Sequence, residues 1–188
     1  MNFAVTPEER RVLLETARES VESYLERREP RWPEVPVPLT VPRGAFVTLT
    51  AGGHLRGCIG RLTPSGPLID TVRAMARAAA FEDPRFPGIR PEDWPGVSIE
   101  ISVLGPMERL ASPEDLRIGA HGLYIVQGFR AGVLLPQVAT EWGWGREEFL
   151  AQVCRKAGLP PSAWKEPTAE LYRFEAAVFG EGEETPSG

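Results

Sequence analysis

Apolar and polar residues alternate along residues 44–51, and Gly52 and Gly53 follow directly. Alternation with a period of two is typical of a strand that buries one face, and a pair of glycines supplies the backbone angles of a tight hairpin. The pattern therefore predicts a hairpin whose return strand covers residues 55–60.

The same alternation recurs in the second half of the chain. Residues 97–104 form the clearest predicted strand, with Glu100 on its polar side. Strands are also predicted at 122–127 and 132–135, which a second hairpin joins, and at 171–179. These segments supply most of the strands that a sheet would need.

Three segments repeat apolar residues at helical spacing instead. They predict helices at 7–28, around 68–79 and at 147–157. Thr6 and Glu9 form a capping box at the start of the first helix, because each side chain can bond to the backbone of the other residue.

Hairpins interleaved with helices predict an α+β fold, with a mainly antiparallel sheet and flanking helices. Prolines recur through residues 30–42, which forbids a helix there and predicts an extended strap across the fold. We expect one domain over residues 1–180, which could divide into two subdomains. A disordered acidic tail is expected at 181–188.

Length, net charge and the lack of long apolar runs argue against some classes of function. A chain of 188 residues is long enough for one ordinary domain with its own core. Its net charge of −5 argues against a broad binding face for duplex nucleic acid, which needs a concentrated basic surface. Neither a basic leader nor a long apolar run occurs, so we expect a soluble, cytoplasmic protein without a membrane segment.

The cysteines, Cys58 and Cys154, lie far apart and form no C-x-x-C motif or Cys/His cluster. This pattern favours a reducing compartment and predicts neither a disulfide framework nor a structural zinc site. No phosphate-binding loop or hydrolase elbow occurs either, so no cofactor is expected.

The return strand of the first hairpin combines an arginine and a cysteine with two glycines. Period two places His54, Arg56 and Cys58 on one face, with about 6.6 Å between alternate residues along the strand. Leu55 and Ile59 are expected on the other face.

An arginine beside a cysteine favours the thiolate, which prepares a nucleophilic or redox-active thiol. Gly57 and Gly60 could let a ligand approach the backbone closely. The same residues also fit a structural interpretation, in which Cys58 is buried, Arg56 pairs with a carboxylate and the glycines mark a bulge. Both interpretations stay open from the residues alone.

A nucleophilic cysteine needs a base, and the candidates are His54, Glu100, His121 and Glu141. Glu100 and His121 could face a cleft, whereas His54 is expected at a solvated turn. A buried Glu100 paired with an arginine would instead be structural. A metal site formed by His54, Cys58 and His121 lacks the usual ligand spacing, so we expect none.

Three tryptophans, Trp142, Trp144 and Trp164, lie near the segment 136–141. An exposed aromatic patch at this position could bind a partner. Tryptophans are highly buried on average, and we therefore predict that all three belong to the core.

The hexapeptide Leu55–Gly60 (LRGCIG) is the signature of the AMMECR-type domain family, which the chain resembles. Further segments are similar to other motifs of that family and follow in the same order, which makes the resemblance far more specific than the hexapeptide alone. These segments are 78–86, 99–104 followed by Pro106, 118–123, and 134–139 with Trp142.

The resemblance implies a two-lobed α+β fold, with lobes of unequal size and the hexapeptide in the larger lobe beside a cleft. Residues gathered from distant motifs usually meet at a site or support it. The candidate catalytic residues are Cys58, Arg56, Glu100 and His121, and the candidate binding residues are Arg56, Gly57, Gly60, Gln137 and Glu141.

Members of the family occur with, or fused to, Memo-type and radical SAM proteins, so both are expected partners in a shared pathway. The resemblance implies no established activity. Three functions stay open: a binding or accessory domain whose cleft recognises a small ligand or a partner segment, which we favour; an enzyme that uses Cys58 as nucleophile or redox thiol; and an RNA- or nucleotide-binding protein.

Overall fold

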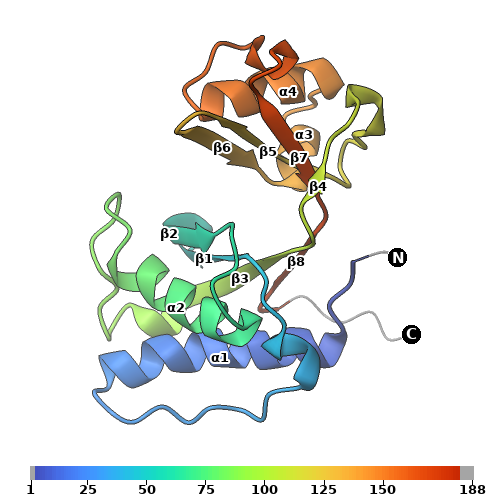
Figure 1. Cartoon of the computed structure of the whole chain (residues 1–188). Helices are drawn as coiled ribbons and strands as arrows, with labels where there is room; N and C mark the ends of the chain where they lie inside the picture. The colour runs from blue at the N-terminus through green and yellow to red at the C-terminus, as the bar shows by residue number, and fades with distance from the viewer. Residues whose placement is uncertain (1–2, 183–188) are drawn as a thin grey trace. The chain divides into compact units, whose positions relative to one another are not determined.

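The computed structural model describes residues 3–182 and divides the chain into two compact units. The first unit contains the residues up to Leu104 together with those from Ala177 onward, and the second unit is Gly105–Ala176. Over the described residues the chain forms four α-helices and two four-stranded sheets (Figure 1). The predicted α+β class is therefore confirmed.

The first unit places two helices against one face of a sheet (Figure 1). The strand order in this sheet is β2-β1-β3-β8, so β2 forms one edge. Its elements are α1 (Pro7–Leu25), β1 (Ala45–Ala51), β2 (His54–Arg61), α2 (Leu68–Phe81), β3 (Val97–Leu104) and β8 (Ala176–Gly180), with short 3₁₀ turns at Val37–Thr40 and Trp94–Gly96.

Helix α1 starts where the capping signal predicts. The Thr6 hydroxyl accepts a hydrogen bond from the Glu9 N–H, and the Glu9 carboxylate accepts one from the Thr6 N–H. The helix ends at Leu25, earlier than the predicted residue 28. Arg27 takes a left-handed φ of 53°, which stops the right-handed helix.

Strand β1 separates the two faces of the first sheet. Ala45, Val47 and Leu49 are fully buried against the helices, as the alternation predicts. Phe46 and Thr48, with the other alternate residues of β1, lie on the opposite face and are half-buried. We call this second side of the sheet the open face, because neither helix of the unit covers it.

The second unit has a sheet with the strand order β4-β7-β5-β6. Within residues 3–182, no helix is both long and apolar enough to span a membrane. The elements of the second unit are β4 (Glu108–Arg109), β5 (Gly122–Gln127), β6 (Arg130–Leu134), α3 (Pro136–Glu141), α4 (Arg146–Lys156) and β7 (Glu170–Phe174), with 3₁₀ turns at Pro113–Asp115 and Ala163–Lys165.

The single strand predicted at 171–179 is wrong, because the structure contains two strands there. Strand β7 pairs with β4 and β5 of the second unit, whereas β8 joins β3 in the first unit. The chain returns from the second unit to the first just after Glu175. The carbonyl of Glu175 accepts a hydrogen bond from the N–H of Gly105, the residue at which the chain enters the second unit. Apolar alternation continues through this crossing, so the sequence pattern does not reveal it.

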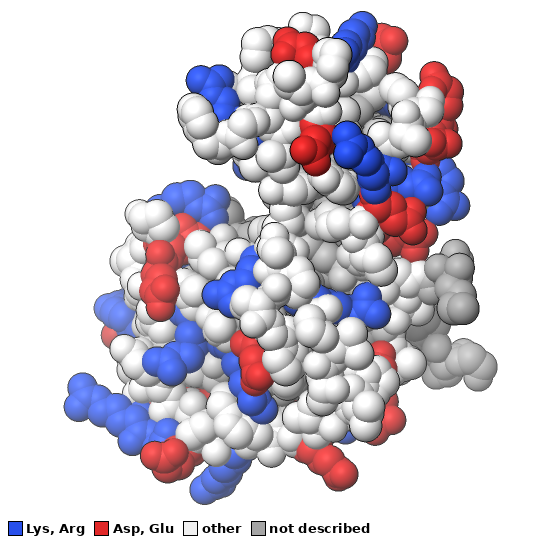
Figure 2. Space-filling view, in the orientation of Figure 1, with Lys and Arg blue, Asp and Glu red and all other residues white. Residues whose placement is uncertain are grey.

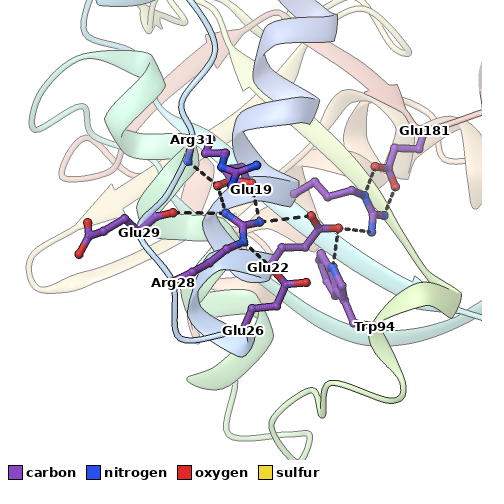
Figure 3. A network of polar contacts seen from close by, with 9 residues as sticks. Glu19, Glu22, Glu26, Arg28, Glu29, Arg31, Trp94 and Glu181 are labelled. Atoms are coloured by element: carbon purple, nitrogen blue, oxygen red, sulfur yellow. Dashed lines mark hydrogen bonds and ion pairs between the residues drawn. The ribbon is translucent and has the colours of Figure 1, made fainter.

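The end of β8 is fixed to α1 by an ion pair. The carboxylate of Glu181 accepts hydrogen bonds of 2.6 and 2.5 Å from the guanidinium of Arg18 (Figure 3). It also accepts one of 3.0 Å from the N–H of Ile99. The predicted tail at 181–188 therefore begins too early, since Glu181 is held on the sheet. Residues 183–188 lie outside the described residues.

The contacts of Arg18 extend this ion pair into the middle of the first unit. Its guanidinium also donates to the Val97 carbonyl at 2.7 Å and lies 4.7 Å from the centroid of the Trp94 ring. The Trp94 indole N–H donates to Glu22 of α1 (Figure 3). Trp94 is therefore an anchor of its loop.

Replacing Glu181 should destabilise the protein more than replacing an exposed glutamate of α1. Glu181→Gln removes a largely buried charge-assisted pair, so we expect the free energy of unfolding to fall by about 1–3 kcal/mol. Glu15→Gln breaks the exposed Arg11–Glu15 pair and should cost about 0.5 kcal/mol or less. Urea unfolding measures both, and equal losses would contradict the proposed importance of the Arg18–Glu181 pair.

Candidate functional site

The hexapeptide forms most of β2, and its pairing with β1 contains a β-bulge. Cys58 pairs with Thr48, but the register then shifts so that Leu55 pairs with Thr50. Arg56 is the extra residue without a partner on β1. The bulge was one of the alternatives that the sequence left open.

The bulge changes the predicted distribution of side chains. Ile59 pairs with Val47 on the helix-covered side, and Cys58 lies on the open face with Thr48, as predicted. Leu55 was expected on the side of Ile59, but its pairing with Thr50 places it on the open face, where it is 39% exposed. A strict period of two cannot hold across an extra residue.

Cys58 is a free, half-buried thiol. The Thr48 hydroxyl lies 3.3 Å from its sulfur, at hydrogen-bond distance. Thr48 also pairs with Glu100 of β3, so the three residues form one row across β2, β1 and β3. Strand spacing places the Cα atoms of Cys58 and Glu100 about 10 Å apart, and Glu100 is exposed.

Arg56 is half-buried. Within residues 3–182 its guanidinium makes no hydrogen bond or ion pair. The pairing of Arg56 with a carboxylate, which the structural interpretation requires, is therefore absent from the described part of the chain. Among these described residues, Arg56 is thus a cation without an ion pair, two positions before Cys58 on the same strand.

Two residues that the sequence analysis did not select hold the backbone of Cys58. The carboxylate of Asp83 accepts a hydrogen bond of 2.9 Å from the Cys58 N–H, and the guanidinium of Arg85 donates one of 3.3 Å to the Cys58 carbonyl. Because β2 is an edge strand, these bonds satisfy backbone groups that no further strand covers. The family motif at 78–86 contains both residues, with one residue between Asp83 and Arg85, so the sequence could have indicated this pair.

Asp83 is itself held firmly. Arg85 donates to both of its carboxylate oxygens, at 2.9 and 2.7 Å. The Arg85 guanidinium, followed by the Cys58 N–H, holds the pKa of Asp83 well below its usual range. Asp83 is thus a stable anion that fixes the strand backbone, and its carboxylate does not contact the thiol.

Packing explains both glycines of the hexapeptide. A Cβ added to Gly57 would lie 2.0 Å from the carbonyl oxygen of Ala79 in α2. A Cβ added to Gly60 would lie 2.1 Å from the ring of Phe46. The space beside each glycine is therefore filled by protein atoms, which differs from the expected opening for a ligand.

His121 belongs to the second unit, where it is buried in a turn. The backbone N–H of Arg117 donates to Nδ1 of the His121 imidazole at 3.1 Å. The backbone N–H of His121 donates to the Arg117 carbonyl at 2.9 Å. Burial is the main cause that lowers the pKa of His121, and the nearby charges of Arg117 and Arg173 lower it further. The His121 imidazole thus closes this turn.

The other predicted residues of the second unit lie on or beside α3. Gln137 is half-buried and Glu141 is exposed. Trp142 was predicted to be a core residue, but it is 70% exposed and stacks on Trp144, with ring centroids 5.9 Å apart. Trp144 and Trp164 pack partly against the core of the unit. Trp142 follows the C-terminal end of a short helix, where its ring covers a neighbour instead of entering the core.

The structure thus brings together Arg56, Cys58 and the two glycines on β2, with Glu100 in the same row as Cys58. His121, Gln137 and Glu141 belong to the second unit. Among residues 3–182, no three His, Cys, Asp or Glu side chains gather closely enough to hold a metal ion. We call the Thr48–Cys58 pair, together with Arg56 at the adjoining bulge, the Cys58 site.

The sequence matches the AMMECR1 family model over residues 14–179. The chain belongs to the AMMECR1 family. A protein of Methanothermobacter thermautotrophicus is 46% identical over 190 residues, which cover 96% of this chain and 99% of that protein. Protein PH0010 of Pyrococcus horikoshii is 38% identical over 200 residues, covering 100% of this chain and 96% of its own length.

The crystal structure of PH0010 is also similar to this AMMECR1-family chain. It matches with a TM-score of 0.82 at 39% identity, over 90% of each chain. PH0010 is described as an uncharacterized protein, so this similarity supports the fold and indicates no activity. The resemblance that the LRGCIG hexapeptide indicates is confirmed at the level of the family.

A methyl group at Gly57 of the AMMECR1 hexapeptide should destabilise the fold. Gly57→Ala forces a contact with the α2 backbone, which cannot rotate away, so we expect a loss of at least about 2 kcal/mol in the free energy of unfolding. Gly66→Ala is the matched control, because a Cβ there meets no atom within 4 Å. A Gly57→Ala protein as stable as the control would contradict the packing explanation.

His121 should make the stability of this AMMECR1-family chain depend on pH. The folded protein holds the His121 proton less tightly than the unfolded chain, so stability should fall as the pH drops below about 6.5 and be regained above it. One such group contributes at most about 1.4 kcal/mol per pH unit. His121→Asn keeps an acceptor for the Arg117 N–H and should reduce the slope.

Thermal melting between pH 5 and 7.5 measures this effect. His54→Asn, which removes the other histidine, serves as the control. If His121→Asn melts with the same pH dependence as the unmodified protein, His121 does not cause the slope.

Proposed function

We propose that this AMMECR1-family chain is a recognition domain, and that the Cys58 site binds an anionic group of a small ligand or of a partner segment. The observation that carries the proposal is Arg56, which lies half-buried on a β-bulge without an ion pair in the described residues. A partly desolvated cation gains most when an anion pairs with it. The ligand would supply that anion.

The surroundings of Arg56 support a prepared site. Bulges are enriched beside functional sites because they redirect a side chain out of the regular ladder. Asp83 and Arg85 bind the Cys58 backbone from the edge of the sheet, so the strand is rigid next to the bulge. A rigid backbone lowers the entropy that ligand binding would otherwise cost.

The environment of the Cys58 sulfur favours recognition over covalent chemistry. Among residues 3–182, its hydrogen-bond partner is the Thr48 hydroxyl, which is a poor base. Asp83 contacts the Cys58 backbone, and His121 is used in its own turn. A nucleophilic thiol normally has a base within hydrogen-bond reach. The thiol therefore serves as a half-exposed contact surface in our proposal.

The proposed partners are Memo-type and radical SAM proteins, with which AMMECR-type domains are associated by the resemblance. We place the domain in the cytoplasm, since Cys58 and Cys154 are free thiols, which suits a reducing compartment. A partner segment that carries a carboxylate toward Arg56 would use the same charge-assisted bond that a small anion would use.

Removing the charge of Arg56 should weaken partner binding without unfolding the domain. Purified Memo-type and radical SAM proteins are passed over the immobilised chain, and dissociation constants are measured. We expect Arg56→Gln to weaken the retained partner about tenfold, as loss of a charge-assisted hydrogen bond does. The free energy of unfolding should change by no more than about 0.5 kcal/mol.

Arg61→Gln is the matched control, because Arg61 ends the same strand, is exposed and makes no ion pair within residues 3–182. Bound partner should also slow the alkylation of Cys58 by iodoacetamide. If Arg56→Gln and Arg61→Gln retain the partner protein equally, the proposed role of Arg56 is wrong. If the unmodified chain retains neither protein, the proposed partners are wrong.

A further inference from the structure

The first unit contains a groove that is separate from the Cys58 site. Its walls come from the C-terminal half of α1, the connector at 29–32 and the first half of α2, and the connector runs back along α1 (Figure 1). Its volume is about 580 Å³, which lies within the usual range for small-molecule sites. Arg56, Thr48 and Cys58 do not line it.

Arginines dominate the charge of this groove. Arg28 is paired with Glu19 and Glu26 (Figure 3), and Arg73 is paired with Asp70 at 2.9 Å.

Arg27 and Arg77 also line the groove, and within residues 3–182 neither makes an ion pair. Four arginines and two carboxylates, Glu29 and Asp70, line the groove, so its lining has an excess of positive charge in a chain whose net charge is −5. Basic and acidic side chains both occur on the face that Figure 2 shows. The planar guanidinium of an arginine matches the geometry of a phosphate.

The groove also has two partly exposed aromatic rings. Tyr24 is 52% and Trp32 is 41% exposed. The guanidinium of Arg77 lies 4.5 Å from the centroid of the Tyr24 ring, and that of Arg73 lies 4.2 Å from the centroid of the Trp32 ring. Each arginine thus holds its ring in place and leaves part of the ring surface open. A planar ring beside a guanidinium is suited to stacking on a nucleobase.

We propose that this groove binds a nucleoside monophosphate. Arg27 and Arg77 contact the phosphate, and the base lies against the open surface of Trp32. Phosphate alone would leave the aromatic surface unused, and a neutral nucleoside would leave both charges without a partner. The volume of about 580 Å³ accommodates both halves of a mononucleotide.

Calorimetric titration tests the proposal with AMP, GMP, CMP and UMP, and with inorganic phosphate and adenosine as the two partial ligands. We expect at least one nucleotide to bind at least tenfold more tightly than either partial ligand. Arg77→Gln and Arg27→Gln should each weaken that nucleotide about tenfold, because each removes one charge-assisted contact. Trp32→Leu should weaken the nucleotide and leave phosphate binding unchanged.

Arg61→Gln carries the same change in net charge outside the groove and should bind the nucleotide like the unmodified chain. Arg27 has no side-chain partner within residues 3–182, so Arg27→Gln keeps the test valid even where Arg77→Gln reduces the melting temperature. Arg56→Gln should bind the nucleotide normally, which separates this site from the Cys58 site.

Three outcomes would overturn the proposal. They are the absence of nucleotide binding at millimolar concentration, equal affinity for nucleotide and inorganic phosphate, and unchanged affinity in both Arg27→Gln and Arg77→Gln.

Discussion

The ion pair between Arg18 and Glu181 joins the two separated parts of the first unit. Glu181 follows β8, which reaches the sheet only after the whole second unit, and Arg18 belongs to the helix that opens the chain. The same guanidinium bonds to Val97 and lies over Trp94, so α1, β3, the loop before β3 and the returning strand meet at one charge. This junction therefore links the first helix to the two strands at the far side of the sheet from β2.

The Cys58 site depends on how one edge of that sheet is completed. Glycines let α2 and Phe46 press against β2, and the acid–arginine pair of the following loop binds the outer backbone of Cys58. These contacts use the hexapeptide for packing at most of its positions. Arg56 is the exception, because the bulge removes it from the ladder, and the chemical interest of the motif therefore concentrates on this arginine and its neighbouring thiol.

Local signals predicted the local features well. The capping box of Thr6 and Glu9, the first hairpin and the buried face of β1 depend on neighbours in sequence, so period and turn chemistry identify them. The division of 171–179 into β7 and β8 depends on which distant strands each half meets, and alternation carries no information on that choice. Leu55 was predicted on the wrong face of the sheet, and the role of Arg56 was left open. One extra residue in a strand reverses the faces that the side chains beyond it occupy, and the sequence does not reveal that residue. Trp142 was misassigned because composition cannot tell a core ring from one that stacks on a neighbour.

The second unit is inserted between β3 and β8, and this order constrains synthesis of the protein. While the ribosome makes Gly105–Ala176, strand β3 has an unpaired edge, since its partner β8 does not yet exist. Strand edges of this kind are the surfaces on which incomplete chains aggregate. The inserted unit, whose ends are held together by the Gly105–Glu175 hydrogen bond, can fold first and bring the last strand back close to that edge. Folding of the inserted unit before β8 is made would therefore shorten the time for which the edge of β3 stays unpaired.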